Sequence, residues 1–113
     1  MLTASATTGI DNALIGEIVR RILSVAQPDK IILFGSAATG PMSRDSDIDL
    51  LIVETGPIDR PQEYVRVRRA LGSMGFPFDL LFITKDWFEA SKNVSGGIAY
   101  PAHKHGRVIY EAA

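Results

Sequence analysis

Residues 31–34, Ile-Ile-Leu-Phe, constrain the fold more than any other segment of the chain. A strand with one face in water alternates apolar and polar residues, but this run contains no polar residue. It is therefore predicted to be a central strand that is covered on both faces. A chain of 113 residues is long enough to supply that cover as several helices packed on one sheet.

Two longer segments have the periodicity of amphipathic helices. In residues 11–26 apolar side chains recur every three to four positions, and Pro28 stops the pattern. A second helix is predicted to open at Asp59, which is followed by Pro61 in the first turn. The apolar stripe of this second helix is predicted to consist of Tyr64, Val67, Leu71 and Met74.

The rest of the chain adds short strands and helices. Residues 47–53 and 78–83 are predicted strands, Thr84 caps a short helix, a last helix ends near Gly106, and residues 108–110 add a final strand. This order predicts an α/β (α+β) fold, with a small mixed β-sheet flanked by helices. No linker divides the sequence, so we predict a single domain over residues 1–113, with residues 1–9 as a flexible lead-in.

The composition narrows the classes of partner. A net charge of −1 argues against a dominant electrostatic grip on nucleic acid or on an anionic membrane. Cysteine is absent, which excludes disulfides and thiolate metal sites. No segment approaches the roughly 20 apolar residues that cross a bilayer, and the N-terminus lacks the features of a signal peptide. We therefore predict a cytoplasmic protein that binds neither membranes nor nucleic acid.

Acidic residues interrupt two of the predicted strands. Asp47 and Asp49 flank Ile48, and because side chains alternate along a strand, both carboxylates point to the same face. Asp79 is the single acid in the apolar third strand, where an idle carboxylate would be costly to bury. Neighbouring carboxylates repel each other unless a cation lies between them, and such oxygen ligands suit Mg²⁺. If the third strand lies beside the second, we expect catalytic and metal-binding roles for Asp47, Asp49 and Asp79, with two Mg²⁺ ions.

Gly35 and Ser36 are predicted to bind phosphate. A turn that leaves a buried strand and enters a helix exposes backbone N–H groups to an anion. Gly35 lets the backbone approach closely, and the Ser36 hydroxyl can donate to a phosphate oxygen. Each feature also has an interpretation that needs no ligand. Gly35 and Ser36 could form a simple turn, Asp47 and Asp49 a solvated strand cap, and Asp79 could be an edge residue. Their agreement in spacing and strand placement favours the functional interpretation.

At this point the sequence resembles a known family. Residues 34–36 (Phe-Gly-Ser), ten further residues and residues 47–50 (Asp-Ile-Asp-Leu) are similar to the Gly-Ser-x10-Asp-x-Asp signature of the DNA polymerase β-like nucleotidyltransferase superfamily. The size, residues 78–80 and the ending at residues 108–111 resemble its minimal prokaryotic members, the minimal nucleotidyltransferases (MNT). The resemblance covers residues 14–111, nearly the whole chain.

The resemblance implies a fold, an activity and a partner. It implies the polymerase β-like nucleotidyltransferase fold, with Asp47 and Asp49 as metal ligands, Asp79 near the attacking group, and Gly35 and Ser36 on the triphosphate. Minimal members commonly act as antitoxins of HEPN-type toxins and transfer AMP from ATP to a toxin tyrosine. The resemblance therefore implies an adenylyltransferase with ATP as co-substrate, Mg²⁺ as cofactor and a HEPN toxin as partner.

The sequence departs from the family pattern after Ser36. Many members have arginines where this chain has Ala37 and Thr39, which removes positive charge from the triphosphate site. Arg44 or a residue of a partner chain is expected to bind the nucleotide instead, and the enzyme could be weak or dependent on its partner. His103 and His105 diverge on a helix, so they are not expected to share a metal.

Two other functions stay open. One is a non-catalytic antitoxin that neutralises its partner by occlusion, which the missing arginines favour and the three carboxylates oppose. The other is a small-molecule nucleotidyltransferase, although such enzymes usually carry a further domain around the acceptor. Either a homo-oligomer or a hetero-oligomer is compatible with the sequence.

Overall fold

The computed structural model describes residues 12–35 and 47–113 of the chain. Over these residues the sheet has four strands in the order β3-β2-β1-β4. β1 is antiparallel to both β2 and β4, whereas β2 and β3 are parallel. The elements in chain order are α1 (Asn12–Leu23), β1 (Lys30–Phe34), β2 (Ile48–Glu54), α3 (Arg60–Leu71), β3 (Phe78–Thr84), α4 (Lys85–Ser91), α5 (Ala99–His105) and β4 (Arg107–Glu111).

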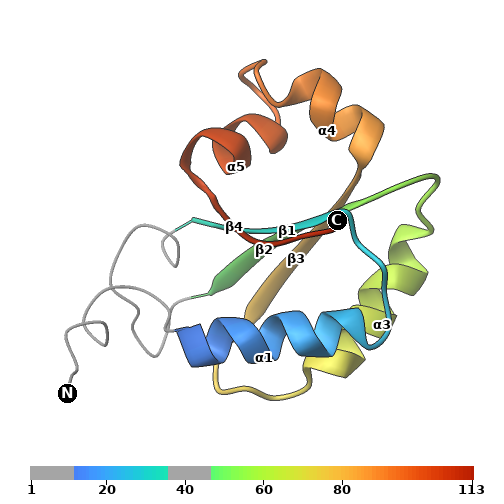
Figure 1. Cartoon of the computed structure of the whole chain (residues 1–113), viewed down its shortest axis with the longest axis vertical. Helices are drawn as coiled ribbons and strands as arrows, with labels where there is room; N and C mark the ends of the chain where they lie inside the picture. The colour runs from blue at the N-terminus through green and yellow to red at the C-terminus, as the bar shows by residue number, and fades with distance from the viewer. Residues whose placement is uncertain (1–11, 36–46) are drawn as a thin grey trace.

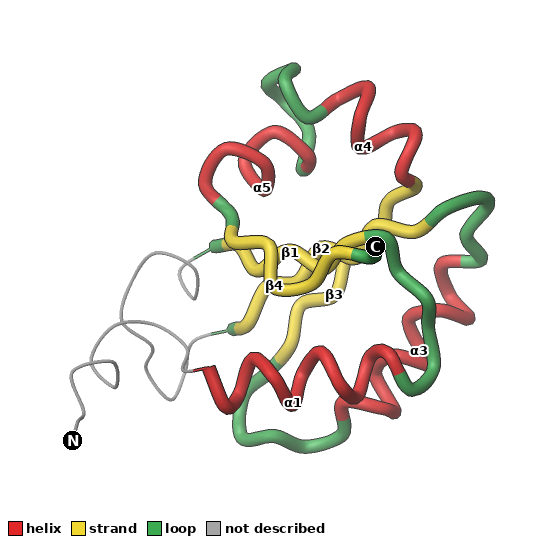
Figure 2. The backbone as a smooth tube through the Cα atoms, in the orientation of Figure 1, coloured by secondary structure: helices red, strands yellow, loops and turns green. Residues whose placement is uncertain are grey.

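Helices cover both faces of this mixed sheet, as predicted. α1 and α3 lie on one face, and α4 and α5 lie on the other (Figures 1 and 2). β1 is an inner strand: Ile31 and Leu33 pack toward α1 and α3, while Ile32 packs with Ala99 and Ala102 of α5. The run without polar residues is thus the centrally placed strand that the sequence predicts, and the α/β (α+β) fold class is confirmed.

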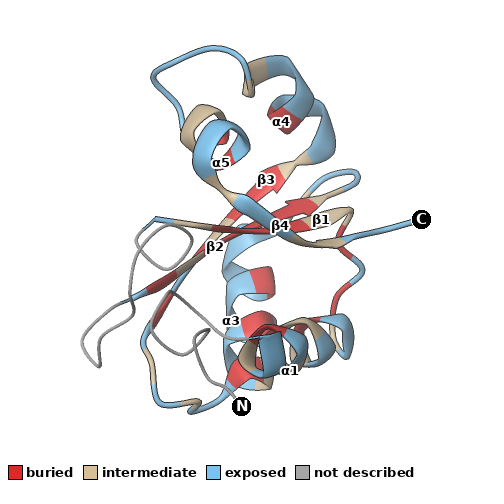
Figure 3. Cartoon of the chain, turned by 60° about the vertical axis from the view of Figure 1, so that its left-hand side comes forward, coloured by how far each residue is buried: buried red, intermediate tan, exposed pale blue. Residues whose placement is uncertain are grey.

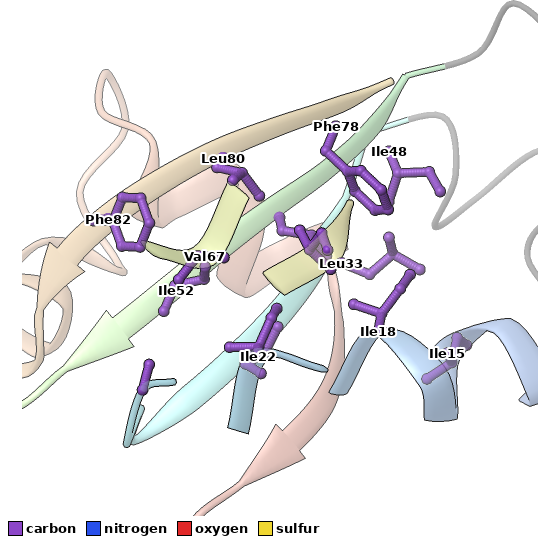
Figure 4. Close-up of a cluster of buried hydrophobic side chains, with 14 residues drawn as sticks. Ile15, Ile18, Ile22, Leu33, Ile48, Ile52, Val67, Phe78, Leu80 and Phe82 are labelled. Carbon is purple, nitrogen blue, oxygen red and sulfur yellow. The ribbon is translucent and has the colours of Figure 1, made fainter. Parts of the chain in front are cut away.

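The larger core cluster lies between the sheet and the helices α1 and α3. Ile18 and Ile22 of α1 are fully buried there, opposite the side chains of β2 and β3 that face this layer (Figure 4). α1 ends at Leu23, three residues before the predicted end, because the Ser24 N–H bonds to the Arg20 and Arg21 carbonyls in a closing turn. The predicted start of this helix and the proposed lead-in lie outside the described residues.

α3 begins as the sequence predicts, but two residues of its predicted stripe are wrong: Tyr64 is exposed, and Met74 lies beyond the end of the helix at Leu71. The Asp59 side chain accepts a hydrogen bond from the Gln62 N–H at 3.2 Å, so the predicted cap is present. Val67 and Leu71 are fully buried, whereas Tyr64 is 42% exposed and Glu63 takes the inward position. Glu63, Val67 and Leu71 are spaced four residues apart, and this row faces the sheet.

A smaller cluster lies between the sheet and the helices α4 and α5. Phe88 of α4 is buried in this cluster together with Ala99 and Ala102 of α5. Figure 3 shows α4 and α5 on the side of the sheet opposite α1 and α3. The predicted cap of α4 is present, since the Trp87 N–H donates to the Thr84 hydroxyl at 3.1 Å. Within the described residues no helix is both long and apolar enough to cross a membrane.

Candidate active site

Two of the predicted catalytic acids lie side by side on neighbouring strands. β3 pairs with β2 in parallel, and Asp79 stands directly opposite Asp49 in the register. Ile48 and Leu50 point into the core under α1 and α3, so Asp49 between them points to the face that carries α4 and α5. Phe78 and Leu80 flank Asp79 in the same way. The sequence predicts this alternation, and the structure shows that the third strand lies beside the second, as the sequence analysis required for Asp79 to approach Asp49.

Gly35 borders this acid pair from β1. Phe34 is the register partner of Asp49, and Gly35 follows it with φ +74°, a left-handed conformation that favours glycine. A Cβ on Gly35 would lie 2.2 Å from Asp49 Oδ2, so any side chain there would displace the carboxylate. The sequence predicts a glycine that admits phosphate. The described residues add a different reason for it, which is room for the Asp49 carboxylate.

Burial and two neighbouring acids raise the pKa of Asp49. Burial raises the pKa of Asp49 most, followed by the negative charges of Asp79 and Asp47 and by a hydrogen bond to the Asp79 carboxyl. Asp47 directly precedes β2 and is exposed, as is Asp79, whereas Asp49 is half-buried. A divalent cation would relieve this repulsion, which is the electrostatic signature expected of a metal site.

The donor set fits Mg²⁺ only as a partial shell. Asp49 and Asp79 offer carboxylate oxygens at one point, with Asp47 nearby, and Mg²⁺ commonly takes one or two carboxylates and completes its shell with water and phosphate. In the part of the chain that the structure describes, no three His, Cys, Asp or Glu residues converge on a single ion position. Ser36 and Arg44, the other predicted nucleotide-binding residues, lie outside the described residues.

A second pair of acids lies at the opposite end of β2, and the sequence analysis missed it. Glu54, the last residue of β2, meets Glu63 of α3, and Arg66 donates to Glu63 at 2.9 Å. Arg66 also donates to the Val25 carbonyl, which ties α3 to the loop before β1. The four-residue spacing of Glu63 and Val67 could have revealed a buried acid. An open cleft of about 910 Å³ borders this group, so it is not the cleft of the predicted catalytic acids.

Comparison with known families now identifies the chain. Residues 15–101 match the family described as the nucleotidyltransferase domain. The chain belongs to this family. The match spans both acid-bearing strands and the segment that joins them, so the predicted family and the predicted enzyme class, a nucleotidyltransferase, are confirmed.

Solved structures of low sequence identity share this nucleotidyltransferase fold. One is a mutant of the toxin-antitoxin MntA-HpeT, with 17% identity and a TM-score of 0.64. The other is a toxin-antitoxin with AMP-PNP, with 17% identity and a TM-score of 0.65. Both alignments cover 87% of this chain and 73% of the other. No curated protein sequence matches the chain.

Proposed function

We propose that this nucleotidyltransferase is an antitoxin that transfers AMP from ATP to a tyrosine of a partner toxin of the HEPN type. The observation that carries the proposal is the in-register pair of Asp49 and Asp79 on parallel strands, with Gly35 against the Asp49 carboxylate. Paired acids that face outward from a buried sheet suit a cation and a triphosphate better than they suit packing.

The proposed roles follow from how each acid is placed. Asp49 and Asp79, with Asp47 nearby, would hold Mg²⁺, which would supply positive charge to the triphosphate when it is bound. The acceptor oxygen forms a bond to the α-phosphorus of ATP, the bond from that phosphorus to the β-phosphate oxygen breaks, and pyrophosphate leaves. Asp79, which is more exposed than Asp49, would accept the hydroxyl proton. Gly35, Ser36 and Arg44 would bind the phosphates.

The nature of the partner is supported by the two similar structures. Both are toxin-antitoxin structures, and one of them holds AMP-PNP, an ATP analogue. The exposed side chains of α4 and of the segment after it include Trp87 and Val94, at 64% and 61% exposure. A chain with a net charge of −1 would dock through shape and apolar contact rather than through charge.

An acid-to-amide double variant separates chemistry from docking. We expect Asp47→Asn/Asp49→Asn to co-purify with the toxin, because the helix faces are unchanged, but to add no AMP to it. Intact-mass measurement of the co-expressed toxin checks for the added nucleotide. The double variant should also fail to protect cells at native expression levels.

The same experiment tests the alternatives. Full protection by the double variant would reject the enzymatic account in favour of occlusion, the route that Ala37 and Thr39 favour. AMP found on a small molecule rather than on a protein would point to the small-molecule nucleotidyltransferase.

A further inference from the structure

The sheet has two edge strands, β3 and β4, and they differ in regularity. β4 pairs with β1 through a register that shifts between Ile31 and Ile32, so the ladder is irregular there. β3 pairs with β2 without a shift, from Phe78 to Thr84. Irregularities at an edge hinder the addition of another strand, whereas a regular edge presents a row of backbone groups that can pair with one. β3 is therefore the edge that suits an added strand.

Alternate residues of β3 direct their backbone groups away from β2. Successive residues of a strand point their N–H and C=O groups to opposite sides. The Pro77 carbonyl accepts a hydrogen bond from the Ile48 N–H of β2 at 2.9 Å, so Pro77 points toward β2. By this alternation Asp79 also bonds to β2, while Phe78 and Leu80, on either side of it, direct their N–H and C=O groups outward.

Arg60 closes this outward side of β3 near its far end. Phe82 is the next outward-directed residue after Leu80, and its carbonyl accepts a hydrogen bond from Arg60 Nε at 3.2 Å. A charged side chain on a sheet edge hinders pairing with another strand. In the part of the chain that the structure describes, neither Phe78 nor Leu80 forms a backbone hydrogen bond on the outward side. The open part of the edge is thus the part that flanks Asp79.

A strand added at this point would place side chains beside the acid pair. Side chains alternate between the two faces of a sheet, so the residue opposite Asp79 in an added strand shares the face of Asp79 and Asp49. Neighbouring strands lie about 4.8 Å apart, and side chains directly opposite each other are in contact. A tyrosine at this position has a side chain long enough to carry its hydroxyl across Asp79 toward Asp49.

The edge of β3 is continuous with the surface proposed to dock the partner. α4 begins at Lys85, directly after β3 ends at Thr84, and it carries the exposed Trp87. Asp79 lies roughly 17 Å along the strand from Thr84, a distance that one small domain can span. A single partner can therefore contact α4 with its folded body and the open edge of β3 with an extended segment.

We propose that the edge of β3 at Phe78 and Leu80 binds an extended segment of the partner toxin by strand addition, and that this segment carries the acceptor tyrosine to Asp79. The inference rests on the proposed function and deepens it, because it names how the acceptor is held. In this mode of recognition main-chain hydrogen bonds supply affinity, and alternate side chains supply specificity. The ligand is thus an extended polypeptide with a phenolic hydroxyl on the face that it shares with the acids.

Amide hydrogen exchange, measured by NMR on the full chain with and without the toxin, tests this proposal. ATP is left out, so no AMP is transferred. We expect the amides of Phe78 and Leu80 to exchange at least about tenfold more slowly in the complex, because each gains a hydrogen bond. The matched controls lie in the same strand: the amides of Asp79 and Leu81, which bond to β2, should be protected in both states.

A proline substitution gives an independent test. Leu80→Pro removes an outward N–H and no hydrogen bond of the sheet, and proline is accepted on the solvent side of an edge strand. Leu80→Val is the matched control, because it also shortens the side chain but keeps the N–H. We expect kcat/KM for AMP transfer to the toxin to be about tenfold lower in Leu80→Pro than in Leu80→Val, with equal binding of Mg²⁺-ATP.

The outcomes separate this inference from the proposed function. Unprotected Phe78 and Leu80 amides, in a complex that transfers AMP once ATP is added, overturn strand addition and leave the proposed function standing. Protection of both amides in the chain without toxin assigns the edge to the chain itself or to a second copy, and also overturns strand addition by the partner. A toxin that binds the wild-type chain but gains no AMP overturns the proposed function and the acceptor role of the segment. The exchange measurement needs no variant, so it decides the matter even if Leu80→Pro does not fold.

Discussion

Each end of β2 carries a carboxyl group that meets a second acid, and the two pairs differ in how their charge is balanced. At the start of the strand, Asp49 meets Asp79 on the outward side of the sheet. At its end, Glu54 meets Glu63 in the layer that α1 and α3 cover. Each pair raises the pKa of a carboxyl group, yet the protein compensates only one of them with its own residues.

At the Glu54 end, residues of the chain itself balance the charge of the two acids. Arg66 donates to Glu63. The pKa of Glu54 is raised to about 8, first by burial, then by the hydrogen bond to Glu63 and by the negative charge of Glu63. Glu54 Oε2 is buried, and as an ionised acceptor it has no donor among the described residues. With its pKa raised, a protonated Glu54 carboxyl can donate to Glu63, so a proton and Arg66 together would balance this pair.

At the Asp49 end, no described cation counters the burial and the acidic neighbours that raise the pKa of Asp49. Asp47 adds a third negative charge instead of a cation. The comparison teaches that paired acids alone do not mark a ligand site. What marks it is a pair whose charge the fold leaves for something else to balance.

The largest effect expected is on metal-dependent nucleotide binding. Asp49→Asn removes one charged ligand and should weaken Mg²⁺-dependent ATP binding by at least about tenfold, a loss seen even for partners of metal ligands. Glu54→Gln, which changes an acid of the other pair on the same strand, should leave that binding unchanged. Calorimetry of ATP with and without Mg²⁺ compares the two variants. Equal binding by Asp49→Asn and wild type would reject the metal role.

The second effect is a pH dependence that arises at the Glu54 end. The pKa of Glu54 is about 8 in the folded chain against an ordinary 4.5, so the folded state keeps a proton that the unfolded state releases. Stability should therefore fall as the pH rises between those two values and level off above the higher one. Glu54→Gln keeps a hydrogen-bond donor for Glu63 and cannot ionise, so it should stabilise the chain by about 1–2 kcal/mol at pH 8.

Denaturant unfolding across this pH range measures that difference. Glu89→Gln is the matched control, because Lys92 lowers the pKa of Glu89 first through a hydrogen bond and the group stays ionised over the same range. Parallel pH profiles for wild type and Glu54→Gln would show that the two glutamates do not share a proton.

The smallest effect expected is on the metal-free stability of the acid pair. Asp79→Asn removes one of two facing charges and should stabilise the chain by about 1 kcal/mol without metal. Thermal melts in a chelator measure it, with Glu111→Gln as a surface control that stays within about 0.5 kcal/mol. A large loss of stability in Asp79→Asn would make that residue structural and would remove the contrast between the two ends of β2.

The sequence by itself determined the local elements and the direction in which the acids point. The caps at Asp59 and Thr84 act over a few neighbouring residues, so a local pattern is sufficient to predict them. The alternation of Asp49 with Ile48 and Leu50 follows from strand geometry in the same way. The unbroken apolar run of β1 required cover on both faces, whatever the order of the strands.

Only the tertiary structure decided which strands are neighbours and what each acid meets. Asp79 contributes to the site because β3 pairs with β2, and no local pattern fixes that choice. Glu63 rather than Tyr64 faces inward because Glu54 and Arg66 come from other positions to meet it. Gly35 is needed at its position because the Asp49 side chain of the next strand occupies the space of its Cβ. These are contacts between residues far apart or on different turns, whose energies depend on packing that a one-dimensional pattern does not contain.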